Sequence, residues 1–306
     1  DYGISQLIEQ HRNDANPSYP IRWDTRDFPL NSDFFTPTFG VALYHESSVT
    51  VGKWLFTAGL RFDYEHVALK YHSHCDTGYM IYHEQEGGVF EPFRHISVNI
   101  DDHGRMSRQF FEVLPKIAVL YNLGDKGNNL YLNVSKGYKA GGYNIISNKM
   151  TTQVVELEYG KESLWNYEVG AKYFSVNGRF NMNGALFYID WKDQQIFVME
   201  MMGPIIKNAG DARSIGAEID LSWECLPRLV YFLSSGYSNS EYYYHLTKEY
   251  EGNKIVMAPE FTMNTGASYT QAIKSSLFKF FTVTTSITGF GTQYFDEANT
   301  MKQDPY

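Results

Sequence analysis

The sequence predicts an all-β protein, an antiparallel transmembrane β-barrel. Long segments alternate between apolar and polar side chains, and the polar positions carry many charges. Short and long connections between these segments alternate along the chain. Barrels whose strands cross a bilayer show the same alternation, with brief turns on one side and long loops on the other. Aromatic residues make up 16% of the chain and fall at strand ends, where lipid and water would meet.

The segment 130–144, read LYLNVSKGYKAGGYN, shows the alternation most clearly. Leu130, Leu132 and Val134 are apolar, whereas the residues between them are mostly polar. A period of two places successive side chains on opposite faces of a strand. The chain then enters Ala140-Gly141-Gly142, where glycine permits backbone conformations that other residues resist. We therefore expect a strand that reaches the rim of a sheet and opens into a loop at 140–160.

The N-terminal third supplies two strands before a long polar stretch. Residues 1–36 are polar and broken by prolines, so we expect an outer loop there. A strand at 38–46 and a turn at 48–53 lead to the clearest strand, 54–65, in which an apolar row alternates with a charged one. Residues 67–107 lose the pattern, which predicts a long loop with a hairpin near 79–82.

The remaining strands follow the same rule. A strand at 110–121 and a polar turn at 124–128 precede the segment already described. Further strands are expected at 165–173, 180–191, 208–223, 229–242, 261–269 and 277–290. Short turns are expected at 175–178, 224–228 and 271–275, and longer loops at 199–204 and 243–259. The end, 291–306, is polar and aperiodic and predicts another outer loop.

Composition excludes several classes of protein. No run of apolar residues is long enough for a transmembrane helix, but alternating strands leave no such run either. The formal net charge of −9 and the lack of a basic cluster argue against nucleic acid as a partner. A soluble β-sandwich could share the alternation, but it gives little reason for so many charges on long strands. The decisive expectation is that Phe56, Leu60, Tyr167 and Ile219 lie in a row that no second layer covers.

Four motifs resemble one family of membrane barrels. NVSKGYKAGGYN at 133–144 and WNYEVGAKY at 165–173 resemble strands on either side of an outer loop in TonB-dependent outer-membrane receptors. NAGDARSIGAEIDLSW at 208–223 and WLFTAGLRFDYE at 54–65 are similar to two further strands of that family. The four together, in the family's order, are a more specific signal than any one alone.

The resemblance implies an outer-membrane active transporter of Gram-negative bacteria that imports a scarce nutrient such as a ferric siderophore, haem, cobalamin or a glycan. Barrels of the family have about 22 strands, so the roughly ten expected here would form a later portion of one barrel domain spanning 1–306. TonB would act through a plug that is not present in this chain. The open alternatives are a passive porin-like barrel and a soluble β-rich binding module.

Two groups of polar residues are candidates for the wet interior and its rim. The row opposite the apolar one is expected to line the lumen, where its charges pair with one another or hold a plug: Arg61, Asp63, Glu65, Glu168, Lys172, Glu218 and Asp220. Tyr138, Lys139 and Tyr143 lie where a strand enters its loop, and could meet an anionic ligand by charge and stacking. The competing interpretation of Lys139 is a lysine that snorkels to the lipid headgroups.

One outer loop collects possible metal ligands. His72, His74 and Cys75 stand close together between His66 and His83, and imidazole and thiolate bind zinc, copper or haem iron. His-x-His-Cys fits no standard spacing, so a solvated loop is the competing interpretation. No catalytic motif stands out, and we expect neither an enzyme nor a bound cofactor.

Overall fold

The computed structural model describes residues 2–25, 31–124, 127–145, 157–200, 203–275 and 277–306. The chain divides into two compact units. The hairpin unit comprises Asp1–Phe39, His66–Gln109 and Gly142–Glu158, and the sheet unit comprises Gly40–Glu65, Phe110–Gly141 and Tyr159–Tyr306. No helix in the described part of the chain is long and apolar enough to span a membrane.

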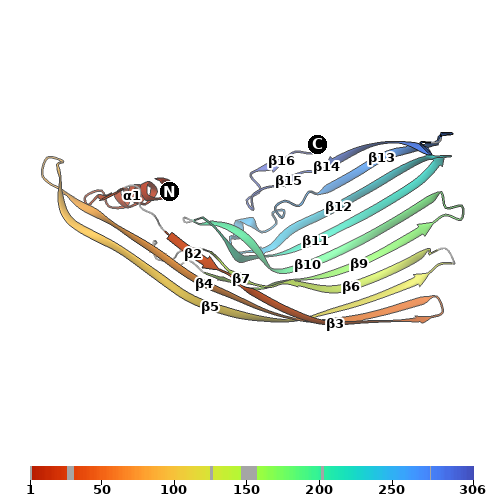
Figure 1. Ribbon diagram of the computed structural model, residues 1–306, viewed down its shortest axis with the longest axis horizontal. Helices are drawn as coiled ribbons and strands as arrows, with labels where there is room; N and C mark the ends of the chain where they lie inside the picture. Colours follow the sequence, from red (N-terminus) through yellow and green to blue (C-terminus); the bar gives the residue numbers. More distant parts are fainter. Residues whose placement is uncertain (1, 26–30, 125–126, 146–156, 201–202, 276) are drawn as a thin grey trace. The chain divides into compact units, whose positions relative to one another are not determined.

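The sheet unit is built from long antiparallel strands that follow one another in chain order (Figure 1). Its strands are β3 (Thr38–Val51), the first part of β4 (Trp54–Glu84), the last part of β5 (Phe90–Asn122), β6 (Asn129–Lys139), β9 (Glu162–Phe174), β10 (Phe180–Glu200), β11 (Gly203–Leu226), β12 (Leu229–His245), β13 (Phe261–Ala272) and β14 (Phe280–Phe290). Each of the ten expected strands is present, and most run beyond their expected ends. The prediction of an antiparallel barrel sheet is therefore confirmed over the described residues.

Tight turns join the strands where the sequence predicted them. Gly52 and Gly178 have φ angles of 59° and 71°, which glycine adopts without steric cost. Only Pro227 and Arg228 separate β11 from β12. The expected turn at 124–128 includes two residues outside the described ones, and much of the expected loop at 140–160 also lies outside them.

The apolar row of the sheet unit is exposed, and no described part of the chain forms a second layer over it. Phe56, Leu60, Tyr167 and Ile219 are 42%, 39%, 43% and 37% exposed. Among the described residues of this unit, Ile196, Ala209, Ala212, Tyr242 and Ile255 form a small cluster of buried side chains. A soluble sandwich would cover such a row with a second layer, so the exposed row fits lipid as its surroundings.

The hairpin unit corrects the prediction of a long loop at 67–107. Strand β4 continues to Glu84, β5 begins at Phe90, and the turn between them is closed by a hydrogen bond from the Gln85 N–H to the Val89 oxygen at 2.8 Å. The expected hairpin turn near 79–82 is therefore displaced toward 85–89. In this stretch Ser73 and Cys75 are buried on one face, while His72 and His74 are exposed on the other. The buried face carries small or polar side chains, so the sequence shows no apolar row although one face is covered.

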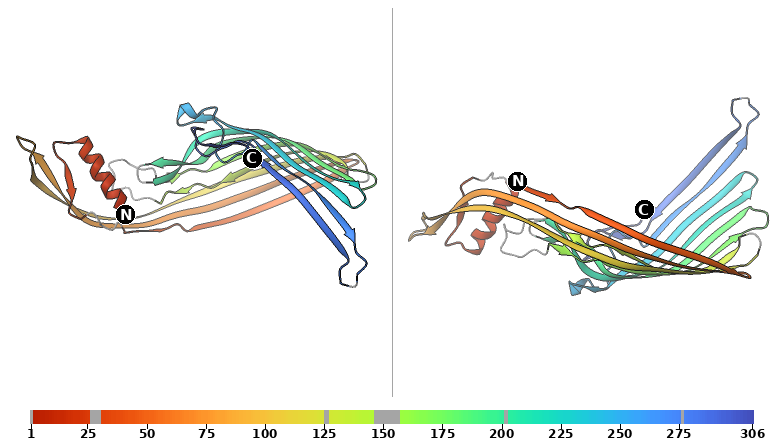
Figure 2. Two further views of the ribbon diagram at one scale, coloured as in Figure 1. Left: turned by 90° about the horizontal axis from the view of Figure 1, so that it is seen from above. Right: turned by 60° about the horizontal axis from the view of Figure 1, so that its bottom comes forward.

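Residues 1–36 are also more regular than predicted. Helix α1 (Tyr2–Ala15), β1 (Ile21–Trp23) and β2 (Asn31–Phe35) occupy this segment, and both short strands pair with β4. Figure 2 shows α1 alongside the hairpin of β4 and β5. The prolines that suggested a loop separate these elements instead of preventing them.

Shorter elements complete the fold. β7 (Gly142–Tyr143) pairs with β8 (Glu158–Tyr159), η2 (Lys248–Tyr250) follows β12, and β15 (Gln293–Tyr294) pairs with β16 (Lys302–Gln303). The expected loop at 199–204 is wrong for the described residues, because Glu200 pairs directly with Gly203. Cys75 and Cys225 are both free thiols.

Candidate functional site

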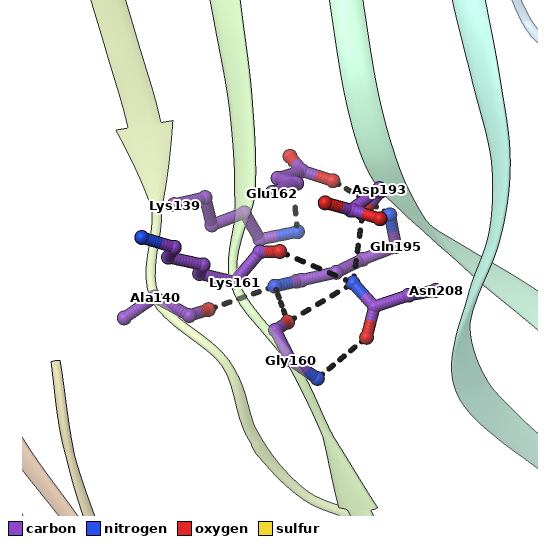
Figure 3. Close-up of polar contacts among 8 residues, drawn as sticks. All are labelled: Lys139, Ala140, Gly160, Lys161, Glu162, Asp193, Gln195 and Asn208. Atoms are coloured by element: carbon purple, nitrogen blue, oxygen red, sulfur yellow. Dashed lines mark hydrogen bonds and ion pairs between the residues drawn. The ribbon is translucent and has the colours of Figure 1, made fainter.

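Two side-chain amides, on β10 and β11, bind the chain at the end of β6 and just before β9 (Figure 3). The Asn208 side chain accepts a hydrogen bond from the Gly160 N–H and donates to the oxygens of Gly160 at 3.1 Å and Asp193 at 2.7 Å. The Gln195 amide donates to the Ala140 oxygen at 2.8 Å and to the Gly160 oxygen at 3.0 Å. We call Asn208 and Gln195 the amide clasp, because they hold the chain both where it leaves β6 and where it enters β9.

A bulge in β10 aims Gln195 at this junction. The register of β10 against β11 shifts between Trp191 and Gln194 and again between Gln194 and Gln195. Asp193, within the bulge, has a φ of 54°, a left-handed conformation that Asp tolerates better than most residues. The Asp193 N–H donates to the Asp211 carboxylate at 2.9 Å. Bulges commonly redirect a side chain in this way.

Three lysines and two buried carboxylates surround the clasp. The Glu112 side chain is 4% exposed and lies 2.9 Å from Lys136 Nζ, with Lys161 Nζ in contact with its other oxygen. Glu162 accepts a hydrogen bond from the Gln195 N–H at 2.7 Å and lies 4.0 Å from Lys139 Nζ. We call Lys136, Lys139 and Lys161 the lysine rim.

Two side chains of the lysine rim remain partly exposed. The side chains of Lys139 and Lys161 are 63% and 48% exposed, whereas Lys136 is 23% exposed. A carboxylate can be buried without a large loss of stability only when cations and hydrogen bonds offset the cost of removing its charge from water. Glu112 and Glu162 therefore hold the lysines in place, and the three lysines outnumber the two carboxylates by one positive charge.

Tyr138 is bound to predicted lumen residues. Its hydroxyl donates to Glu65 at 2.7 Å and to Asp63 at 3.3 Å, and Arg61 forms an ion pair with Asp63. Asp63 is 5% exposed, so its charge is compensated within the protein. The structure thus brings a predicted ligand contact together with three predicted lumen charges.

The other predicted lumen residues lie in hollows of the sheet unit. Glu168 and Lys172 line a hollow of about 410 Å³. Glu218 and Asp220 line another of about 320 Å³, where the Ser234 hydroxyl donates to Asp220 at 2.6 Å. That these side chains face a wet lumen stays a prediction.

Tyr143 belongs to the hairpin unit. It lies in β7 and is 7% exposed. Tyr138 and Lys139 belong to the sheet unit, so joint action of the three on one ligand stays a prediction.

The candidate metal ligands do not converge. His72 contacts Asp101 at 2.9 Å and His74 contacts Asp76 at 3.5 Å, both on exposed side chains. Cys75 is fully buried. Successive residues of a strand point to opposite faces, so Cys75 is turned away from His74. Among the described residues, no group of three His, Cys, Asp or Glu side chains is arranged to hold a metal ion.

The motifs, strand order and rim geometry point to one family. The model of one protein family, described as TonB dependent receptor-like, β-barrel, matches residues 2–306. This chain belongs to that family. Such barrels lie in the outer membrane of Gram-negative bacteria, so the chain is part of a multi-pass outer-membrane barrel.

Relatives in the TonB-dependent family include a curated receptor. The pesticin receptor of Yersinia pestis is 26% identical over 229 residues, which cover 72% of this chain and 32% of that receptor. The chain thus spans about a third of the length of this relative.

Solved structures of TonB-dependent receptors share the fold. The ferric yersiniabactin uptake receptor FyuA of Yersinia pestis has a TM-score of 0.69 at 22% identity and covers 90% of this chain and 38% of its own. The siderophore receptor PiuA of Acinetobacter baumannii has a TM-score of 0.63 at 15% identity, with coverage of 90% and 36%.

Most of the site could not be predicted from the sequence. Asn208 begins the motif at 208–223, and nothing in the sequence indicates which backbone groups its amide binds. Gln194 and Gln195 interrupt the alternation of β10, which is the signal that could have indicated the bulge. Glu112 and Lys161 lie 49 residues apart in the sequence, so their contact depends on tertiary structure.

Proposed function

We propose that the protein is an outer-membrane receptor that takes up a ferric siderophore with energy from TonB. The observation that carries the proposal is the family match over residues 2–306. The relatives named as uptake receptors for siderophores support this substrate class over haem, cobalamin or a glycan.

The lysine rim supplies a chemical reason for an anionic or oxygen-rich cargo. Lys139 and Lys161 carry positive charge at the ends of β6 and β9 and remain accessible to water. Ammonium groups attract carboxylate, phenolate and hydroxamate oxygens, which are the groups that chelate ferric iron. The amide clasp keeps the backbone beneath these lysines in one conformation, so the charges are positioned before the ligand arrives.

Uptake of radioactive iron by cells tests the proposal. Deleting the gene should abolish uptake of one class of ferric siderophore under iron limitation, and removing TonB from an otherwise wild-type strain should do the same. Uptake that continues without TonB would contradict active transport and favour a passive barrel. Normal iron uptake after deletion, with loss of another TonB-dependent nutrient, would contradict the siderophore.

A double variant tests the role of the rim. We expect Lys139→Gln with Lys161→Gln to weaken binding of the ferric siderophore to the purified receptor by about tenfold, because two exposed charges are lost. Lys279→Gln, in the connection between β13 and β14, is the matched control and should leave binding unchanged. Equal binding by both variants would exclude the rim from recognition.

A further inference from the structure

The hairpin unit contains a cavity of its own, separate from the two hollows of the sheet unit. Its volume is about 430 Å³, and residues of α1, β1, β4 and β5 line it. The residues that matter here are Arg12, Tyr19, Ile21, Tyr79, Ile81 and Phe93.

Hydrogen bonds fix the walls of this cavity. Asn13, on α1, accepts from the Ile21 N–H at 2.7 Å and donates to the Ile21 oxygen at 3.1 Å. The Trp23 indole donates to the Ser5 oxygen at 3.0 Å. Strand β1 in turn pairs with β4, with Ile21 opposite Ile81. The helix is therefore attached to the sheet at two points, and the cavity does not require a ligand to form.

Aromatic rings line the cavity and remain open. The ring centres of Tyr19 and Phe93 lie 5.9 Å apart in an edge contact, and those of Tyr79 and Trp23 lie 5.4 Å apart, also edge to face. Phe93 is 64% exposed and Tyr19 is 40% exposed. Rings exposed around a hollow offer stacking surface to a flat ligand.

The charge of the lining is positive. The Arg12 guanidinium donates to the Tyr79 hydroxyl at 3.3 Å and lies 5.7 Å from the centre of that ring. A guanidinium has five N–H donors in a planar fork that fits a carboxylate. Among the described residues that line the cavity, none is a carboxylate. The nearby Glu9 side chain accepts from the Trp23 N–H at 3.3 Å.

We propose that this cavity binds a small aromatic anion, a planar ring that carries a carboxylate or phenolate group. The ring packs against Tyr19, Tyr79 and Phe93, and the acidic group binds the guanidinium of Arg12. The volume lies in the range of small-molecule sites in proteins. This site is separate from the lysine rim, and its binding reaction needs neither transport nor TonB.

Saturation-transfer NMR on the purified receptor in detergent tests the proposal, with salicylate as the probe. We expect saturable binding of salicylate and none of benzylamine, a cation of similar size. Arg12→Gln should weaken salicylate binding by at least about tenfold, since a charge-assisted bidentate contact is lost. Arg22→Gln is the matched control, because Arg22 lies 5.3 Å from the ring centre of Tyr82 and does not line the cavity.

A second variant and a folding check keep the test decisive. Phe93→Leu should reduce the preference for salicylate over cyclohexanecarboxylate, because the stacking ring is removed. Each variant is first shown to be folded by its resistance to unfolding in detergent. The proposal is overturned if Arg12→Gln binds salicylate like the control, if benzylamine binds equally well, or if millimolar salicylate shows no saturable binding. None of these results bears on iron uptake. The cavity proposal can therefore be wrong while the proposed function is right, and the reverse is also true.

Discussion

Strand β4 contains two regions with one backbone conformation and two side-chain patterns. From Trp54 to Glu65 the apolar and polar residues alternate, and the apolar row is exposed. From His66 to Glu84 the strand continues, but most side chains on both faces are polar or small. The contrast shows that an apolar period of two arises where one face of a strand meets hydrocarbon. Where the covered face packs within the protein, as at Ser73 and Cys75, small and polar side chains fill it and the sequence shows no apolar row.

A charge introduced on the lipid face should have the largest effect on stability and so test this contrast most strongly. Val169, near the middle of β9, is 50% exposed, and Val89, in the turn of the hairpin unit, is 60% exposed. We expect Val169→Arg to lower the free energy of unfolding by about 2–4 kcal/mol, because hydrocarbon cannot solvate the guanidinium. Val89→Arg should change it by less than about 0.5 kcal/mol.

Urea unfolding in lipid vesicles, followed by tryptophan fluorescence, measures both valine variants. Equal effects would mean that the two regions share one solvent, and the distinction between lipid-facing and water-facing surfaces would be lost.

The buried carboxylate at the strand ends should matter more than an exposed one. Glu112 is 4% exposed on its side chain and pairs with Lys136 at 2.9 Å, while Glu46 is 48% exposed and pairs with Lys116 at the same distance. Glu112→Gln should cost about 2 kcal/mol, because two lysines lose their counter-charge in a partly buried place. Glu46→Gln should cost at most about 1 kcal/mol. Unfolding curves of the two variants that coincide would contradict the argument from burial.

Loss of the clasp should have a smaller and more local effect. Asn208→Ala removes the side-chain partner of the Gly160 N–H, and we expect about 1–2 kcal/mol of local destabilisation at the start of β9. Asn264→Ala is the control, since Asn264 makes a single weak contact with Thr288 at 3.4 Å on an exposed face. Hydrogen exchange at Gly160 should accelerate only in the first variant. Unchanged exchange would show that the clasp does not hold this junction.

The smallest expected effect is a pH dependence near the C-terminal hairpin. Burial raises the pKa of Glu297, and the neighbouring Asp296 raises it further. The folded state therefore holds this proton more tightly than the unfolded chain does. Its stabilising contribution is complete below the ordinary pKa of glutamate and is lost as pH rises through the raised pKa.

Glu297→Gln should abolish the pH dependence of the C-terminal segment. The readout is exchange of the Lys254 amide, which donates to Asn299 at 2.7 Å, after correction for intrinsic rates. The same pH profile in the variant would assign the effect to another group.

The contrast between the two parts of β4 also explains which parts of the fold the sequence predicts. The strands of the sheet unit could be predicted because hydrocarbon on one side and water on the other leave a period of two in residues such as Phe56 and Arg61. The hairpin of β4 and β5 and the segment 1–36 could not, because hydrogen bonds along the backbone leave no mark on polar side chains. Tyr138 and Lys139 could be placed at a rim by their position before two glycines. Their partners Glu65 and Glu162 could not, since those contacts depend on the register of neighbouring strands.

Spin labels placed one at a time along residues 166–172 of β9 test the central claim most directly. Collision with oxygen, which dissolves in lipid, should peak at positions 167, 169 and 171. Collision with a water-soluble nickel complex should peak at 166, 168 and 172. The predicted result is two profiles of period two that are out of phase. Profiles without this period, or with Glu168 on the oxygen-rich side, would contradict the assignment of one face to the membrane and the other to water.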